Sequence, residues 1–130
     1  MKNLSKVLAV VLAFAMALSM VSFAAYTDVA EDANYSEAVA VLSALDILEG
    51  YEDGSFKPDA TITRAEFATV VIRMLGLADS ASGGAEIFTD VAADHWANGY
   101  IALAAQQGIV NGYGDGRFGP EDPVKYQEAI

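Results

Sequence analysis

A repeat with an offset of 62 residues constrains this chain more than any other feature of its sequence. The tripeptide Thr-Asp-Val at residues 27–29 recurs at residues 89–91. Between residues 26–68 and residues 88–130, 14 of 43 aligned pairs are identical without any gap. A fixed period indicates that one structural unit is used again. The chain is therefore predicted to contain two copies of a single fold unit.

Each copy is predicted to form two short helices separated by a long loop. Apolar residues follow the helical period over about residues 35–45 in the first copy and 96–105 in the second. The loop has the pattern Gly-Tyr-x-Asp-Gly-x-Phe-x-Pro at residues 50–58 and 112–120, and Asp-Gly favours a tight turn with a positive φ. A second helix is predicted at about residues 65–75. The predicted fold class is all-α, with short helices and long, turn-rich loops.

The first 24 residues have the pattern of a signal peptide rather than of a folded segment. Lys2 and Lys6 precede an apolar run, and small residues lead to a cleavage site expected after Ala24. A transmembrane anchor is the alternative, but the apolar run is shorter than the roughly 20 residues that a span prefers. We therefore expect secretion, with no membrane partner after cleavage.

The remaining residues divide into two copies and a connection. Repeat 1 covers residues 26–75, a linker of small residues covers 76–87, and repeat 2 covers 88–130. The second copy ends about one turn into its own second helix. We expect either a fragment or a truncation that a partner completes.

The residues around the second helix of the first copy predict an anion site. Thr63 and Glu66 have the spacing of a capping box, in which each residue bonds to the main chain of the other. Arg64 follows the cap directly, at a helix end whose N–H groups favour an anion. A guanidinium there can grip a carboxylate with two hydrogen bonds. The alternative is a solvated arginine on an ordinary well-capped helix.

The charge balance excludes some classes of partner. The net charge is −11, and residues 25–130 carry 5 basic against 18 acidic groups. Such a chain is repelled by nucleic acid and by anionic membranes, so neither is an expected partner. The chain has no cysteine, which excludes disulfides, thiol chemistry and cysteine metal sites.

Three other features invite functional readings that the sequence does not support. The Asp-Gly loops lack the alternating oxygen ligands and the twelfth-position glutamate of an EF-hand, so we expect turns and no metal. His95 is the only histidine and has no recognisable triad partners. The carboxylates are scattered over turns and helix faces, which favours a solvated surface over a glycosidase pair. We predict no enzyme activity and no cofactor.

The order of these motifs resembles the S-layer homology (SLH) repeat. The resemblance rests on Phe-Thr-Asp-Val at 88–91, Asp-His-Trp-Ala at 94–97, Gly-Ile-Val-Asn-Gly-Tyr-Gly-Asp-Gly-Arg-Phe-Gly-Pro at 108–120, and Ile-Thr-Arg-Ala-Glu-Phe at 62–67. It covers essentially residues 26–130. Proteins of this family are typically exported by bacteria with Gram-positive-type envelopes, and three repeats usually form a pseudo-threefold, mostly helical unit. The two copies here would be an incomplete bundle of that kind.

The resemblance implies non-covalent anchoring of a secreted protein to secondary cell wall polysaccharide, often through a pyruvylated sugar. Arg64 matches the family's best-known ligand contact. A sugar carboxylate suits that guanidinium, and the apolar face of a sugar ring suits Trp96, which has a core position on its helix as its alternative role. The expected ligand-binding residues are Arg64, Thr63, Asp28, Asp90, Trp96, Gly50, Tyr51, Gly112 and Tyr113, with Thr63 and Glu66 as structural caps.

The second copy departs from the family pattern. Residues 125–128 read Lys-Tyr-Gln-Glu where the first copy has Thr-Arg-Ala-Glu, and Asn34 stands where the second copy has Trp96. We therefore expect one well-formed cleft, between Arg64 and residues of the second copy. Two alternatives remain open: a self-assembly segment that contacts other SLH repeats or S-layer subunits, and the anchoring fragment of a larger cell-wall hydrolase.

Overall fold

The computed structural model describes residues 26–125 and Glu128. It contains the helices α2 (Ser36–Ala44), α3 (Arg64–Met74) and α4 (Asn98–Gln106), and the short 3₁₀ helix η1 (Ala78–Ser80). Over the described residues the only strand-like pairing is an isolated antiparallel bridge between Thr63 and Pro123. The prediction of an all-α fold with short helices and long loops is confirmed.

The helices begin and end within two residues of the predicted positions because the expected local signals operate. Gly76 after α3 and Gly108 after α4 have φ values of 69° and 71°, the left-handed conformation that ends many helices. After α2, Asp46 has the same conformation, with a φ of 55°. Gly54 and Gly116 have φ values of 79° and 90°, so both Asp-Gly turns form as expected.

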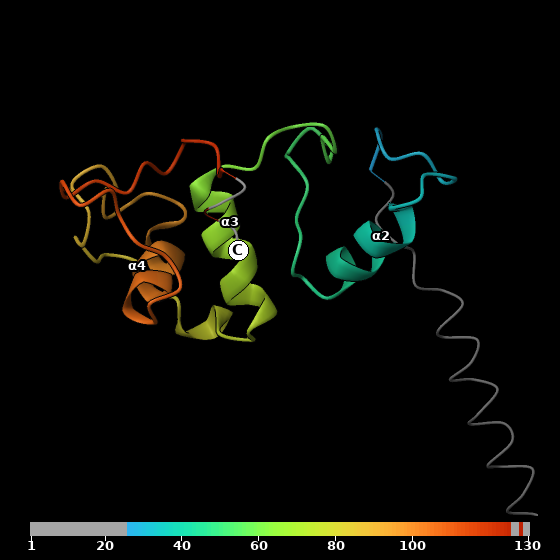
Figure 1. Cartoon of the computed structure of the whole chain (residues 1–130). Coiled ribbons are helices and arrows are strands. Elements are labelled where there is room, and N and C mark those ends of the chain that lie inside the picture. The colour runs from blue at the N-terminus through green and yellow to red at the C-terminus, as the bar shows by residue number, and fades with distance from the viewer. Residues whose placement is uncertain (1–25, 126–127, 129–130) are drawn as a thin grey trace, which may run out of the picture.

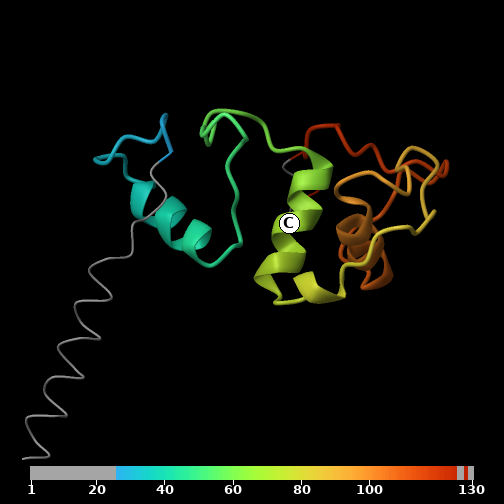
Figure 2. The ribbon, with the colours of Figure 1, turned by 180° about the vertical axis from the view of Figure 1, so that it is seen from behind.

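The main core lies between α3 and α4, which lie side by side in Figures 1 and 2. Small residues on both helices let the two backbones approach closely. The buried apolar residues are Ala65, Ala68, Ile72, Val91, Ala97, Ile101, Ala104 and Phe118. The packed unit thus consists of the second helix of the first copy together with the second copy. Its boundaries differ from those of the sequence repeat.

The helix α2 stands apart from this unit. It is separated from α3 in both views, and the chain between them follows a long extended path (Figures 1 and 2). Within α2 only Val39 is buried, with 7% of its surface exposed. The hydroxyls of Tyr26 and Ser43 lie 2.9 Å apart and tie the start of the first copy to this helix.

The predicted linker, residues 76–87, is packed against α4. Leu77 and Ala81 contact the core. The side chain of Asn98 accepts a hydrogen bond from the main-chain N–H of Ala85 (3.1 Å) and donates one to its oxygen (2.8 Å). A Cβ on Gly99 would lie 2.7 Å from the main-chain oxygen of Ala81, so only glycine lets the connection pass this close to the helix.

Candidate functional site

The capping box at the start of α3 forms as predicted. The main-chain N–H of Glu66 donates to Thr63 Oγ1 (3.2 Å), and the N–H of Thr63 donates to Glu66 Oε2 (2.8 Å). The other carboxylate oxygen of Glu66 accepts from the hydroxyl of Tyr51 at 3.1 Å. Partial burial, and then the charge of Glu66, raise the pKa of Tyr51. Glu66 therefore links the helix start to the loop of its own copy.

The side chain of Arg64 binds the loop of the other copy. Its Nε donates to the main-chain oxygen of Phe118 (2.8 Å) and its Nη2 to that of Asn111 (2.7 Å). The guanidinium carbon lies 4.8 Å from the ring centroid of Tyr113 and 4.6 Å from that of Phe118, within the range of cation–π attraction. With 8% of its surface exposed, Arg64 is buried. The alternative of a merely solvated arginine is wrong.

The main chain of the helix start is also bound to the second copy. The N–H of Arg64 donates to the main-chain oxygen of Asp122 (2.9 Å), and the N–H of Ala65 to that of Pro120 (3.0 Å). With the N–H of Glu66 bonded to Thr63, these three donors have protein acceptors. An anion at this helix end must therefore be bound by the Arg64 side chain, and the expected contribution of main-chain N–H groups is not available.

Arg64 lines a pocket between the copies, here called the Arg64 pocket. Its volume is about 240 Å³. Nη1 lies 3.5 Å from Glu128 Oε2, a carboxylate of the second copy. The pocket is lined by Arg64, Phe67, Ile109, Val110, Asn111, Gly112, Tyr113, Phe118, Val124 and Glu128.

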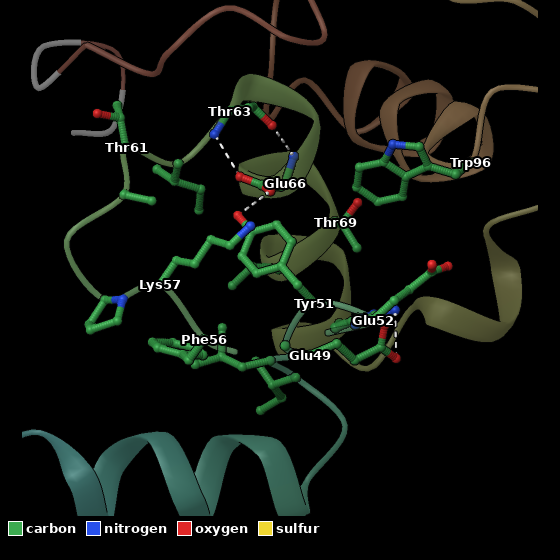
Figure 3. A pocket seen from close by; sticks show the side chains of 18 of the residues that line it. Glu49, Tyr51, Glu52, Phe56, Lys57, Thr61, Thr63, Glu66, Thr69 and Trp96 are labelled. Atoms are coloured by element: carbon green, nitrogen blue, oxygen red, sulfur yellow. Dashed lines mark hydrogen bonds and ion pairs between the residues drawn. The ribbon is translucent and has the colours of Figure 1, made fainter. Parts of the chain in front are cut away.

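A larger pocket, the Trp96 pocket, lies on another side of α3 and has a volume of about 660 Å³ (Figure 3). It is lined by the loop of the first copy, by the face of α3 that carries Glu66 and Thr69, and by Trp96 and Glu121 of the second copy. The Trp96 side chain lies at its edge beside Thr69 (Figure 3) and is 59% exposed. A large apolar ring left open to solvent in a cleft is available to a ligand.

Two cationic side chains, Lys57 and Arg73, also line the Trp96 pocket, and neither was predicted as a site residue. The Lys57 ammonium lies 4.0 Å from the ring centroid of Tyr51. Arg73 Nη2 pairs with Glu49 Oε1 at 3.1 Å. Lys57 is aligned with Gly119, so the two copies differ at this position. The difference alone predicts no role for the lysine.

The residues predicted to bind one ligand are divided between these two pockets. Gly50, Tyr51, Thr63 and Trp96 line the Trp96 pocket, whereas Arg64, Gly112 and Tyr113 line the Arg64 pocket. The remaining two, Asp28 and Asp90, line neither pocket.

Asp28 and Asp90 instead bind main-chain N–H groups of the loops. Asp28 accepts hydrogen bonds of 2.7 Å from the main-chain N–H groups of Phe56 and Lys57, and Asp90 accepts bonds of 2.8 Å from those of Phe118 and Gly119. The bond from Phe56 is the main cause that lowers the pKa of Asp28. Burial alone would raise the pKa of Asp90, but the two N–H groups outweigh it and lower that pKa too.

The recurrence of a glycine at the start of both loops has a packing reason. A Cβ on Gly112 would lie 2.6 Å from both the main-chain oxygen of Arg117 and the ring of Phe88. A Cβ on Gly50 would meet the ring of Tyr26 and lie 2.7 Å from the main-chain oxygen of Ser55. The glycines thus let each loop fold onto the aromatic residue that begins its copy.

Two features are absent from residues 26–125 and Glu128. No helix among them is long and apolar enough to cross a membrane. No group of three or more histidine, aspartate or glutamate side chains among them is arranged to hold a metal ion.

Comparisons with known proteins agree with this architecture. The S-layer homology domain matches residues 25–68 and 87–130. A cell surface protein of Thermoanaerobacter kivui is 45% identical over 138 residues, covering 100% of this chain and 18% of that protein. The middle cell wall protein of Brevibacillus brevis is 37% identical over 136 residues, covering 98% and 13%. A cellulosome-anchoring protein of Acetivibrio thermocellus is 36% identical over 83 residues, covering 62% and 19%.

The chain thus spans less than a fifth of the length of these relatives. No solved structure matches it. The two domain matches coincide with the two copies seen in the sequence, and together they cover more than half of the chain. The chain belongs to the S-layer homology family and is a cell-surface protein with two SLH repeats.

Proposed function

We propose that the chain anchors a secreted protein non-covalently to the bacterial cell wall by binding secondary cell wall polysaccharide. The family match and the similarity to cell wall, surface layer and cellulosome-anchoring proteins support this role. The envelope is of the Gram-positive type in this proposal, and residues 1–24 are the signal peptide that directs export.

The observation that carries the proposal is the arrangement of Arg64. Two main-chain oxygens of the second copy hold Nε and Nη2, so the guanidinium is fixed in direction before any ligand arrives. Nη1 lies 3.5 Å from the carboxylate of Glu128, and both residues line the Arg64 pocket. A pyruvate ketal carries a carboxylate of the same chemistry. It would bind at Nη1, with little conformational entropy lost by the protein.

The sugar ring of the same ligand requires an apolar platform, and Trp96 offers one. Its exposed ring and that of Tyr51, which is 40% exposed, both belong to the Trp96 pocket. The volume of about 660 Å³ is in the usual range for small-ligand sites. Glu49, Glu52 and Glu121 at its wall provide hydrogen-bond acceptors for hydroxyl groups. In this proposal the polysaccharide contacts both pockets.

The proposed role is binding and not catalysis. The enzymes among the relatives match over a small part of their length: an endo-1,4-beta-xylanase A of Thermoanaerobacterium saccharolyticum is 33% identical over 92 residues, only 8% of that protein. An amylopullulanase of Thermoanaerobacterium thermosulfurigenes is likewise matched over 5% of its length. Such short shared segments suit an anchoring region attached to different passenger proteins.

The test is a pull-down of the purified chain with native and with depyruvylated cell wall polysaccharide. Wild type should bind the native form more tightly. Arg64→Lys keeps the charge but loses the planar fork, and should weaken binding to the native form by about 1.5 kcal/mol. It should have little effect on the depyruvylated form, because the carboxylate is then absent. Circular dichroism would verify that the variant is folded.

Two further variants separate the pockets. Trp96→Ala should weaken binding to both forms of the polysaccharide, because stacking on a ring does not need the ketal. Arg117→Ala is the matched control, since that exposed guanidinium pairs with Asp115 of its own loop. If depyruvylation leaves wild-type binding unchanged, the carboxylate site is wrong; if neither form binds, the anchoring function itself is wrong.

A further inference from the structure

The carboxylate of Glu128 faces Arg64 and makes two contacts. One of its oxygens, Oε2, accepts a hydrogen bond from the main-chain N–H of Lys125 at 3.0 Å. This bond is the second-copy equivalent of the bond from Thr63 N–H to Glu66, since Glu128 is aligned with Glu66. The same oxygen lies 3.5 Å from Arg64 Nη1.

The equivalent glutamates of the two copies have different partners, and the copies differ at one nearby acceptor. In the first copy the Tyr51 hydroxyl donates to Glu66, at 3.1 Å. In the second copy the Tyr113 hydroxyl donates to Asp122 Oδ2 instead, at 2.8 Å. The residue aligned with Asp122 is Ala60, which has no acceptor. Asp122 therefore accepts the hydrogen bond of the Tyr113 hydroxyl, and the carboxylate of Glu128 remains available to Arg64.

The contact between Glu128 and Arg64 is weak enough to be exchanged. Its distance of 3.5 Å exceeds the roughly 2.7–2.9 Å of a strong charge-assisted hydrogen bond. The Glu128 side chain is 28% exposed, so water reaches the carboxylate. In contrast, the bonds from Nε and Nη2 to main-chain oxygens are 2.8 and 2.7 Å long. A ligand can replace the glutamate without releasing the arginine.

We propose that Glu128 is a specificity-determining residue that competes, as a carboxylate built into the protein, for the anion position at Arg64. This inference rests on the proposed binding of a pyruvylated polysaccharide. A ligand gains the Arg64 contact only if its own carboxylate displaces that of Glu128. A neutral ligand gains no affinity from Arg64, because it carries no negative charge that could replace the carboxylate of Glu128. Glu128 thus lowers the affinity for anionic ligands and sets how strongly they are preferred over neutral ones.

The test compares wild type with Glu128→Gln on purified native and depyruvylated cell wall polysaccharide. The glutamine oxygen can still accept the bond from Lys125 N–H, so this local contact is preserved. Removing the competing charge should tighten binding to the native polysaccharide about three- to tenfold, the worth of a partly exposed ion pair. Binding to the depyruvylated form should not change. Glu37→Gln is the control, since that exposed carboxylate on α2 lines neither pocket.

A second variant tests the same inference with Glu128 unaltered. Asp122→Ala restores the alanine of the first copy and frees the Tyr113 hydroxyl to donate to Glu128, as Tyr51 does to Glu66. The main-chain oxygen that accepts from Arg64 N–H is unaffected by the substitution. This variant should also bind the native polysaccharide more tightly than wild type.

The outcomes separate this inference from the proposed function. Folded variants that bind the native polysaccharide no more tightly than wild type overturn the role of Glu128 and leave the Arg64 site in place. Tighter binding of both polysaccharide forms also overturns it, because the gain would then not depend on the carboxylate. A wild-type chain that binds neither form overturns the proposed function and the inference together.

Discussion

Arg64 donates a hydrogen bond of 2.8 Å to the main-chain oxygen of Phe118, which lies 54 residues later in the chain. This bond joins the second helix of the first SLH repeat to the loop of the second repeat. It makes the arginine a structural residue as well as a candidate ligand contact. The two roles are compatible because different nitrogens of the guanidinium serve them.

We expect Arg64→Ala to lower the free energy of unfolding by about 2–4 kcal/mol. The substitution leaves the buried main-chain oxygen of Phe118 and the partly buried one of Asn111 without their donors. Urea denaturation followed by circular dichroism measures the change. Arg117→Ala should cost much less, because its ion pair with Asp115 is exposed. Equal losses for the two variants would contradict the structural role of Arg64.

The packing of α3 on α4 predicts which part of the chain an α3 variant destabilises. Ile72 is fully buried, and Ile72→Ala should cost about 2–5 kcal/mol. Because its contacts are with the second repeat, amide hydrogen exchange should accelerate in α4 but not in α2. Met74→Ala is the control, since Met74 is 63% exposed and should change stability by less than about 0.5 kcal/mol. Faster exchange confined to α2 would show that the repeats fold as separate units.

Local signals made the helices and their ends predictable. These signals are the capping box of Thr63 and Glu66 and the left-handed glycines Gly76 and Gly108. Each depends only on residues close to it in the sequence, so the sequence alone is enough to predict it. The repeat likewise predicted two loops of the same form. The fold class followed from these elements and did not require knowledge of their packing.

The partners of each side chain were not predictable in the same way. A repeat shows that a unit recurs, but it does not show that α3 packs on the following copy rather than on α2. For this reason Arg64 was expected to be open to a ligand, and its bonds to Asn111 and Phe118 were missed. The role of Glu128 depends on Asp122 taking the hydroxyl of Tyr113, a long-range contact with no local pattern.

The loop carboxylates predict how stability depends on pH. Hydrogen bonds from main-chain N–H groups hold the pKa of Asp90 and of Asp28 below the ordinary value of about 3.9. Because the folded-state pKa is the lower one, this contribution is present above about pH 4 and is lost as the pH falls through the folded-state value. The free energy of unfolding should therefore decline below about pH 4.

The variant Asp90→Asn tests this cause. It should be less stable than wild type at pH 7, because a neutral amide replaces the carboxylate that accepts from Phe118 and Gly119, and its decline at acidic pH should be shallower. Urea denaturation between pH 7 and pH 2.5 measures both effects. Asp94→Asn alters an exposed carboxylate in the turn before α4 and should follow the wild-type curve. A wild-type slope in Asp90→Asn would show that other groups cause the acid sensitivity.

Trp96 is the only tryptophan of the chain, so its fluorescence reports on one pocket. The indole is 59% exposed in the free protein. If a sugar ring stacks on it, as proposed, the ring loses contact with water and its emission should shift to shorter wavelength as purified cell wall polysaccharide is added. Depyruvylated polysaccharide should give the same final shift at higher concentration, because the Arg64 contact is lost while the stacking is kept.

Two variants make this measurement specific. Arg64→Lys should need more native polysaccharide to reach the wild-type shift, since the carboxylate contact is weakened while the Trp96 ring is kept. Trp96→Phe removes the signal and provides the baseline for light scattering by the polymer. Its own binding, followed by sedimentation with the polysaccharide, should be only modestly weaker because phenylalanine keeps an apolar face. Polysaccharide that sediments with wild type without moving the emission would place the sugar outside the Trp96 pocket.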